Sequence, residues 1–206
     1  MYKTAMLAFA ITAGLSVAAS AQGLQHSDLS VQVTGVFTRT GSNTSLSRLA
    51  NNSAGLLVGY RLHLTKWQAL EVEYGYTRNG QSYLVPATAP GAQATNYAIN
   101  ANMQEAIANE VFTTPRIGGF LQPFLLGGGG VVIFQPRNNF TGLLLQTQTK
   151  GAINYGFGVD FHIGTIGARA EYQGLIFKIP DFKNPAFSIN KWTHVAQPSV
   201  GLVLSW

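Results

Sequence analysis

Residues 153–163 read INYGFGVDFHI, and this stretch decides the fold class. Every second residue, from Ile153 to Ile163, is apolar or aromatic, and the residues between them are Asn, Gly, Asp and His. Because successive side chains of a β-strand point to opposite faces of the sheet, a period of two predicts a strand with one apolar and one polar face.

The same alternation recurs along the chain, which indicates one sheet built from many strands. The other clear segments are residues 31–38, 56–64, 70–78, 166–176 and 197–206.

Residues 104–113 and 120–134 are weaker strand candidates. In the first, Glu105 and Asn109 fall on one face and Glu110 on the other, so the inward face stays open. In the second, glycines 127–130 let the sheet bend, because glycine weakens a strand but permits sharp curvature. The side chains of this segment that we expect to point outward are Phe120, Phe124, Leu126, Val132 and Phe134.

The composition favours a sheet in lipid. Hydrophobic residues make up 46% of the chain and charged residues only 10%, against a charged share of roughly 25% in soluble domains. After the first segment, no apolar run of about 18 residues follows, which excludes a transmembrane helix. An apolar chain without such a helix fits a closed barrel, whose strands satisfy one another's backbone groups without water.

The connections between the eight segments differ in length. Residues 65–68, 114–119 and 164–165 are short turns, whereas the long loops are expected at 40–52, 79–103, 135–148 and 179–190. Bacterial outer-membrane barrels have short periplasmic turns and long extracellular loops. We therefore predict an all-β, eight-stranded antiparallel transmembrane up-and-down β-barrel with both termini in the periplasm.

Aromatic side chains mark both expected rims, where rings prefer the level of the lipid headgroups. Trp67 and Trp206 fall at the periplasmic rim. The aromatic residues expected at the outer rim are Phe37, Tyr76, Phe134 and Trp192.

Residues 1–21 have the pattern of a cleaved secretory signal peptide. Lys3 gives a basic start, an apolar run follows at 4–18, and residues 19–21 read ASA. We expect cleavage between Ala21 and Gln22, which leaves residues 22–206 as the outer-membrane β-barrel domain.

Two stretches resemble OmpA-type outer-membrane barrels. LVGYRL at 57–62, TKW at 65–67 and LEVEYGYTRN at 70–79 resemble their second hairpin, and QPSVGLVLSW at 197–206 resembles their last strand. The resemblance implies insertion into the bacterial outer membrane, with membrane lipid and the barrel-assembly machinery as partners and a possible extracellular ligand at the loops. It also implies that Val200, Leu202, Leu204 and Trp206 form the assembly signal. The peptidoglycan-binding domain of full-length OmpA proteins is not expected.

Charged residues on the inward faces are expected to pair, because an unpaired buried charge costs several kcal/mol. The predicted interior ion-pair network consists of Arg61, His63, Glu71 and Glu73 in one hairpin and Asp160, His162, Arg169 and Glu171 in another. Arg61 is expected to pair with Glu71 or Glu73, and Arg169 with Asp160 or Glu171. A barrel of eight strands has an interior only wide enough for side chains. The network therefore predicts either a structural plug or a narrow gated path for ions and small solutes.

The residues do not favour an enzyme. A lipid-deacylating barrel would need a histidine followed two positions later by serine, and His63 is followed by Thr65. The chain contains no cysteine, and we expect neither a cofactor nor a metal site. A net charge of +5 spread along the chain gives no basic face for nucleic acid. We expect a structural or surface-interaction barrel, with the gated pore as the alternative and a lipid-modifying enzyme third. At the level of fold, the competitor is a soluble lipocalin-like barrel, which would turn its apolar faces inward.

Overall fold

The computed structural model describes residues 26–39, 41–42, 47–50, 52–85, 95–137, 145–183 and 190–206. The expected signal peptide, residues 1–21, lies outside these ranges. The strands are β1 (Ser27–Thr38), β2 (Gly41–Ser42), β3 (Ser47–Ala50), β4 (Ser53–His63), β5 (Gln68–Val85), β6 (Thr95–Thr113), β7 (Leu121–Pro136), β8 (Gln148–Ile163), β9 (Ile166–Lys178) and β10 (Trp192–Ser205). None of the described residues forms a helix long and apolar enough to cross a membrane.

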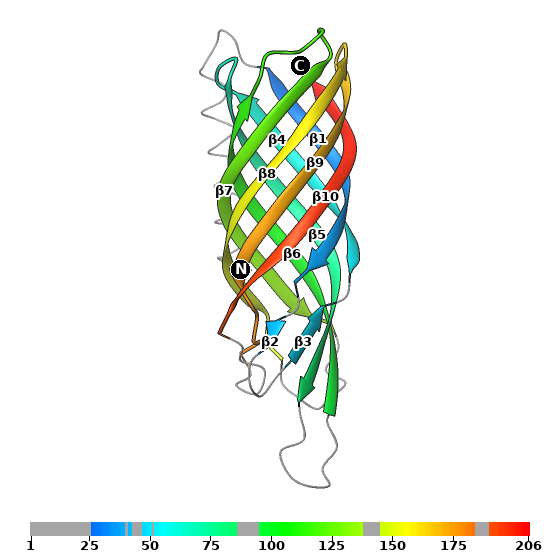
Figure 1. Ribbon diagram of the computed structural model, residues 1–206, viewed down its shortest axis with the longest axis vertical. Coiled ribbons are helices and arrows are strands. Elements are labelled where there is room, and N and C mark those ends of the chain that lie inside the picture. Colours follow the sequence, from blue (N-terminus) through cyan, green and yellow to red (C-terminus); the bar gives the residue numbers. More distant parts are fainter. Residues whose placement is uncertain are drawn as a thin grey trace, which may run out of the picture.

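Eight of the strands close into an antiparallel barrel, as predicted. β1 pairs with both β4 and β10, the pairing continues from β10 through β9, β8, β7 and β6, and β5 closes the ring by pairing with β6 and β4. Figure 1 shows the strands strongly tilted around a tall barrel. Closure leaves no unpaired strand edge around the wall, which a sheet in hydrocarbon requires.

The barrel has two different ends. At one end, here called the terminal rim, the backbone of Ser27 bonds to that of Trp206, and the tight β4–β5 and β8–β9 turns lie at this end too. At the other end, the loop rim, β5 and β6 continue beyond the wall as a long hairpin, and β2 and β3 pair onto β5 (Figure 1).

The long hairpin corrects one expectation. Residues 79–103 were expected to form a loop, but β5 runs on to Val85 and β6 begins at Thr95. The abundance of Asn, Gln, Ser and Ala in this segment favours a loop, although Tyr97, Ile99, Ala101 and Met103 recur at every second position of β6.

The outward faces carry the predicted apolar residues. Val72 is 55% exposed, Phe157 56% and Leu202 67%, and their neighbours along the strands point into the barrel. This inside-out arrangement confirms the transmembrane barrel over the lipocalin-like alternative, which would bury these side chains.

The structure shows which side chains of β6 and β7 point into the barrel. Glu105 and Asn109 are buried inside, and Glu110 is exposed outside. For β7 the expectation was wrong, because the inward, buried side chains are Phe124, Leu126, Val132 and Phe134. Phe120 is exposed as expected, but it precedes the strand. Both faces of β7 are apolar. Polar residues at every second position therefore do not mark its inward face in the sequence.

Glycines in β7 allow close contact with β6. A Cβ atom at Gly128 would lie 2.0 Å from the backbone oxygen of Ala108, and one at Gly130 would lie 2.0 Å from that of Ala106. At Gly127, a Cβ atom would meet nothing within 4 Å. The run therefore combines positions that require glycine with one that does not.

We predict that Gly128→Ala destabilises the barrel by about 1–3 kcal/mol, because the added methyl group displaces the backbone of β6. Gly127→Ala is the matched control and should change the stability by less than about 0.5 kcal/mol. Urea unfolding in detergent micelles, followed by tryptophan fluorescence, measures both. Equal midpoints for the two variants would contradict the close packing of β6 on β7.

Candidate functional site in the barrel lumen

Two arginine–carboxylate pairs face each other inside the barrel. Arg61 on β4 lies directly opposite Glu71 on β5, and its Nε donates to Glu71 Oε2 at 2.8 Å. Arg169 on β9 lies opposite Asp160 on β8, with Nε donating to Oδ1 at 2.7 Å and Nη2 donating to Oδ2 at 3.0 Å. Each hairpin thus pairs one of its own cations with one of its own anions.

The same four side chains also connect the two hairpins across the lumen. Arg61 Nη1 donates to Asp160 Oδ2 at 3.1 Å, and Arg169 Nη1 donates to Glu71 Oε2 at 2.9 Å. Both arginines are no more than 2% exposed. These four residues, here called the lumen quartet, balance two positive charges with two negative charges where no water supplies compensation.

Phe124 completes the surroundings of the quartet. The guanidinium carbon of Arg61 lies 4.1 Å from the centroid of the Phe124 ring, and that of Arg169 lies 5.1 Å away. A cation over an aromatic face is attracted to the electron-rich ring. This contact explains why an aromatic residue that was expected to face lipid points inward instead.

The lumen is acidic overall. The buried charged residues of the described chain include six carboxylates but only two arginines. Among those outside the quartet, Glu73 accepts from Gln173 Nε2 at 2.8 Å, and Glu105 accepts from Gln197 Nε2 at 3.0 and 3.1 Å. Glu171 also accepts a hydrogen bond from Gln173, and one of its oxygens lies 3.9 Å from Arg169 Nη1.

Glu71, Glu73 and Glu171 each place an oxygen atom within 4.8 Å of the other two, a spacing that a metal ion could use. Neighbouring side chains already account for this arrangement. The amide of Gln173 donates to both Glu73 and Glu171, and two guanidinium groups hold Glu71.

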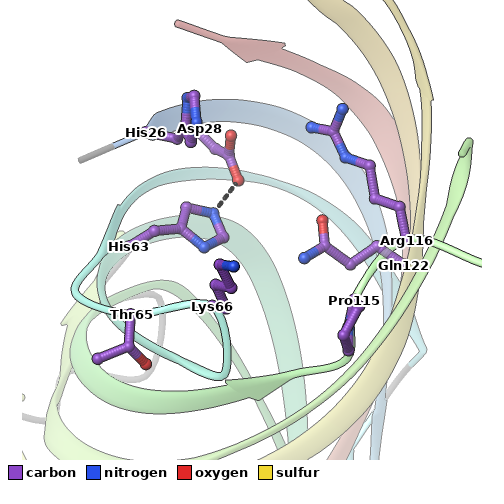
Figure 2. Close-up of a pocket in the computed structure, with 8 residues that line it drawn as sticks. All are labelled: His26, Asp28, His63, Thr65, Lys66, Pro115, Arg116 and Gln122. Carbon is purple, nitrogen blue, oxygen red and sulfur yellow. Dashed lines mark hydrogen bonds and ion pairs between the residues drawn. The ribbon is translucent and has the colours of Figure 1, made fainter. Parts of the chain in front are cut away.

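The two predicted histidines lie near the terminal rim and take partners other than the quartet. His63 Nε2 lies 2.7 Å from Asp28 Oδ2, a hydrogen bond between β4 and β1 that is drawn in Figure 2. His162 is buried, with its Nδ1 3.4 Å from the hydroxyl oxygen of Ser205. Asp28 could not be recognised as a partner from the sequence, because residues 39–52 separate β1 from β4 and a connection of that length does not set the register of two strands.

The lumen changes character toward the loop rim, where buried apolar side chains fill it. The core of this apolar layer consists of Val36, Ala101, Met103, Ile107, Val132, Phe134, Ala152, Leu175, Phe177, Ile179, Phe182 and Val195. The rings of Phe134 and Phe177 lie 5.5 Å apart. Phe134, which was expected at the outer aromatic rim, is therefore a core residue. Stretches that are apolar at consecutive positions, such as 131–134 and 175–177, are the sequence signal for this layer.

Phe182 comes from the segment after β9 and is fully buried in the apolar layer. Gln148 holds that segment, because its Oε1 accepts the backbone N–H groups of Asp181 at 2.9 Å and Phe182 at 3.1 Å. Phe182 has a φ of 51°, which is uncommon for a residue with a side chain. Burial raises the pKa of Asp181, but hydrogen bonds from Gln148 and from the backbone of Lys183 hold it below its usual value. The segment is thus fixed at several points.

The proposed assembly-signal residues lie on the outer face of β10 and directly after it. Val200 is 63% exposed, Leu202 67%, Leu204 47% and Trp206 57%. The centroid of the Trp206 ring lies 6.4 Å from that of the Tyr60 ring on β4. These side chains form a continuous apolar strip at the terminal rim.

Comparison with known proteins agrees with this architecture. Residues 7–200 match the family model described as outer membrane protein beta-barrel domain. No curated protein matches the chain.

Solved structures of bacterial barrels are similar in fold. The attachment invasion locus protein Ail of Yersinia pestis, solved with the heparin analogue sucrose octasulfate, is 16% identical, covers 89% of this chain and 100% of its own, and gives a TM-score of 0.56. Neisserial surface protein A is 12% identical over 85% of this chain and 96% of its own, with a TM-score of 0.56. The outer membrane protein OprG of Pseudomonas aeruginosa is 11% identical over 88% and 95%, with a TM-score of 0.54.

We predict that Arg61 and Glu71 are energetically coupled. Arg61→Met alone leaves a buried carboxylate with one partner fewer and should cost more stability than Arg61→Met together with Glu71→Gln. A double-mutant cycle on urea unfolding in micelles should give a coupling energy of about 0.5–3 kcal/mol.

The control cycle replaces Arg61→Met with Arg78→Met, because Arg78 is an exposed residue of the same strand as Glu71. Its coupling to Glu71→Gln should be close to zero. A coupling for Arg61 as small as that for Arg78 would show that the lumen quartet does not contribute to stability as a unit.

Proposed function

Because the chain belongs to the outer membrane protein beta-barrel domain family, we propose that it is a closed, non-enzymatic barrel that carries surface-exposed loops for structural or interaction roles. The chain is a small bacterial outer-membrane barrel, and this confirms the resemblance to OmpA-type barrels.

The observation that supports a closed barrel is the double obstruction of its lumen. The lumen quartet joins opposite walls by charge-assisted hydrogen bonds of 2.9 and 3.1 Å. The apolar layer with Phe182 fills the lumen toward the loop rim. A hydrated ion would have to separate the residues of the lumen quartet and then cross the apolar layer. Both steps carry a large desolvation cost.

The exposed outer band and the loops define the proposed partners. Membrane lipid would contact side chains such as Val72, Phe157 and Val200, which are all more than half exposed. The barrel-assembly machinery would read the apolar strip that ends at Trp206. An extracellular ligand would bind at the loop rim, where β5 and β6 extend beyond the wall.

A non-enzymatic role fits the contacts of His63 and His162, the two histidines of the predicted interior network. His63 is engaged with Asp28, and His162 lies beside Ser205 in a buried position. Neither faces the lipid at the outer rim, where an enzyme acting on surface lipid would need its base.

The gated pore remains the second candidate, because one observation favours it. Glu73 and Glu105 are buried in the lumen, and within the described chain each is held by a glutamine amide rather than by an arginine. Such carboxylates would attract cations if the two obstructions moved apart.

We predict that the purified protein gives no current steps in a planar lipid bilayer. Phe182→Ala should also remain silent, because the lumen quartet still blocks the path. A gated pore would instead give small discrete steps that become more frequent in Phe182→Ala but not in the control Phe120→Ala, whose ring is exposed in a turn. Large conductance would contradict both functions, since eight strands cannot enclose a wide aqueous channel. A heat-dependent gel shift confirms that each sample is folded.

We further predict that the loop rim faces the outside of the cell. The chain has no cysteine, so single cysteines report position without interference. In intact cells, a membrane-impermeant maleimide should label Arg137→Cys at the loop rim but not Thr165→Cys in the β8–β9 turn; both sites are exposed. Thr165→Cys should be labelled once the outer membrane is permeabilised. The reverse pattern would invert the proposed orientation.

A further inference from the structure

A pocket opens at the terminal rim, separate from the lumen quartet. Its cavity volume is about 350 Å³, which lies within the range of small-molecule sites. The start of β1, the β4–β5 turn and the β6–β7 connection form its walls, and Figure 2 shows Asp28, His63, Lys66, Arg116 and Gln122 around one open space.

Two cations line this pocket without a carboxylate partner. Lys66 comes from the β4–β5 turn and Arg116 from the β6–β7 connection, and both are exposed. Across the part of the chain that the structure describes, neither lies within 4.0 Å of a carboxylate oxygen. Among the described residues that line the pocket, Asp28 is the acidic one, and its carboxylate already contacts His63 Nε2 at 2.7 Å.

The neutral groups of the pocket also offer hydrogen-bond donors. The Thr65 hydroxyl oxygen accepts the backbone N–H groups of Trp67 at 3.1 Å and Gln68 at 3.0 Å, so its own hydrogen is directed elsewhere. Gln122 Nε2 donates one hydrogen to the backbone oxygen of Thr114 at 3.1 Å and keeps a second. Figure 2 shows the Gln122 amide pointing across the pocket toward His63 and Lys66. A ligand that satisfies these groups must supply several acceptor oxygens.

The charge of the lumen restricts such a ligand to the terminal rim. Deeper inside, five buried carboxylates (Glu71, Glu73, Glu105, Asp160 and Glu171) outnumber the two arginines. An anion is attracted by the cations at the rim and repelled by the acidic interior. The pocket is therefore suited to hold an anion rather than to conduct it.

We propose that the pocket lined by Lys66, Arg116, Thr65 and Gln122 binds an oxyanion of the phosphate class. A tetrahedral phosphate group presents several acceptor oxygens to converging donors, and charge-assisted hydrogen bonds from lysine and arginine are the strong ones. The phosphate belongs either to a soluble phosphate compound or to the headgroup of a lipid in the adjacent leaflet. The proposal goes beyond the closed-barrel function and holds whether or not the lumen conducts.

Calorimetric titration tests this site on the full mature barrel in maltoside micelles, which contain no phosphate. Inorganic phosphate and a short-chain phosphatidylglycerol are titrated separately at low salt. We expect saturable binding of at least one, and the double variant Lys66→Gln with Arg116→Gln should weaken it by about tenfold or more, which corresponds to about 1.4 kcal/mol. The matched control, Arg78→Gln with Arg137→Gln, removes two exposed charges elsewhere and should leave the affinity within about twofold.

Each outcome decides between stated possibilities. Tighter binding of inorganic phosphate supports a soluble ligand, and tighter binding of the phospholipid supports a headgroup site. Absence of binding by both, or equal loss of affinity in the test and control variants, overturns the site and indicates only general attraction to a positively charged protein. The heat-dependent gel shift verifies that every variant is folded.

Discussion

Every backbone N–H and C=O group that lies in hydrocarbon must find its partner within the protein, and the rest of this structure depends on that constraint. Closing the sheet through the β5–β6 pairing satisfies it, because no strand edge is left along the wall. Closure with only eight strands then fixes a narrow lumen that side chains must fill. The alternation of apolar and polar residues follows from the same requirement, since one face meets lipid and the other meets the opposite wall.

Two kinds of side chain fill the lumen at different heights: ion-paired side chains and apolar side chains. Near the terminal rim, charged side chains pair across the barrel, and Arg61 and Arg169 share the carboxylates of Glu71 and Asp160. Toward the loop rim, an apolar layer that includes Phe134 and Phe182 replaces them. Ion pairs link specific positions on opposite hairpins, whereas the apolar layer fills space without fixed partners. Together they fill the lumen from the terminal rim toward the loop rim.

The terminal rim carries the opposite charge to the interior behind it. Lys66 and Arg116 give the mouth a positive lining, while the interior behind it is acidic. An anion that is attracted to the positive rim is therefore repelled electrostatically by the acidic interior. The proposed site would hold a phosphate group at the terminal rim, because the acidic interior behind it would oppose the entry of an anion.

The sequence by itself determined the barrel, its eight strands and the outward face of most of them. It also narrowed the hairpin partner of Arg61 to Glu71 or Glu73 and that of Arg169 to Asp160 or Glu171, and the structure then selected Glu71 and Asp160. These features are local, because the period of two and a tight turn fix both the facing and the register of adjacent strands. Only the tertiary structure decided the cross-lumen contacts of the quartet, the pairing of His63 with Asp28, the inward facing of Phe124 and Phe134, and the burial of Phe182. Those contacts join strands that are distant in sequence. They depend on the tilt and stagger with which the closed barrel brings opposite walls together, and no short stretch of residues encodes these quantities.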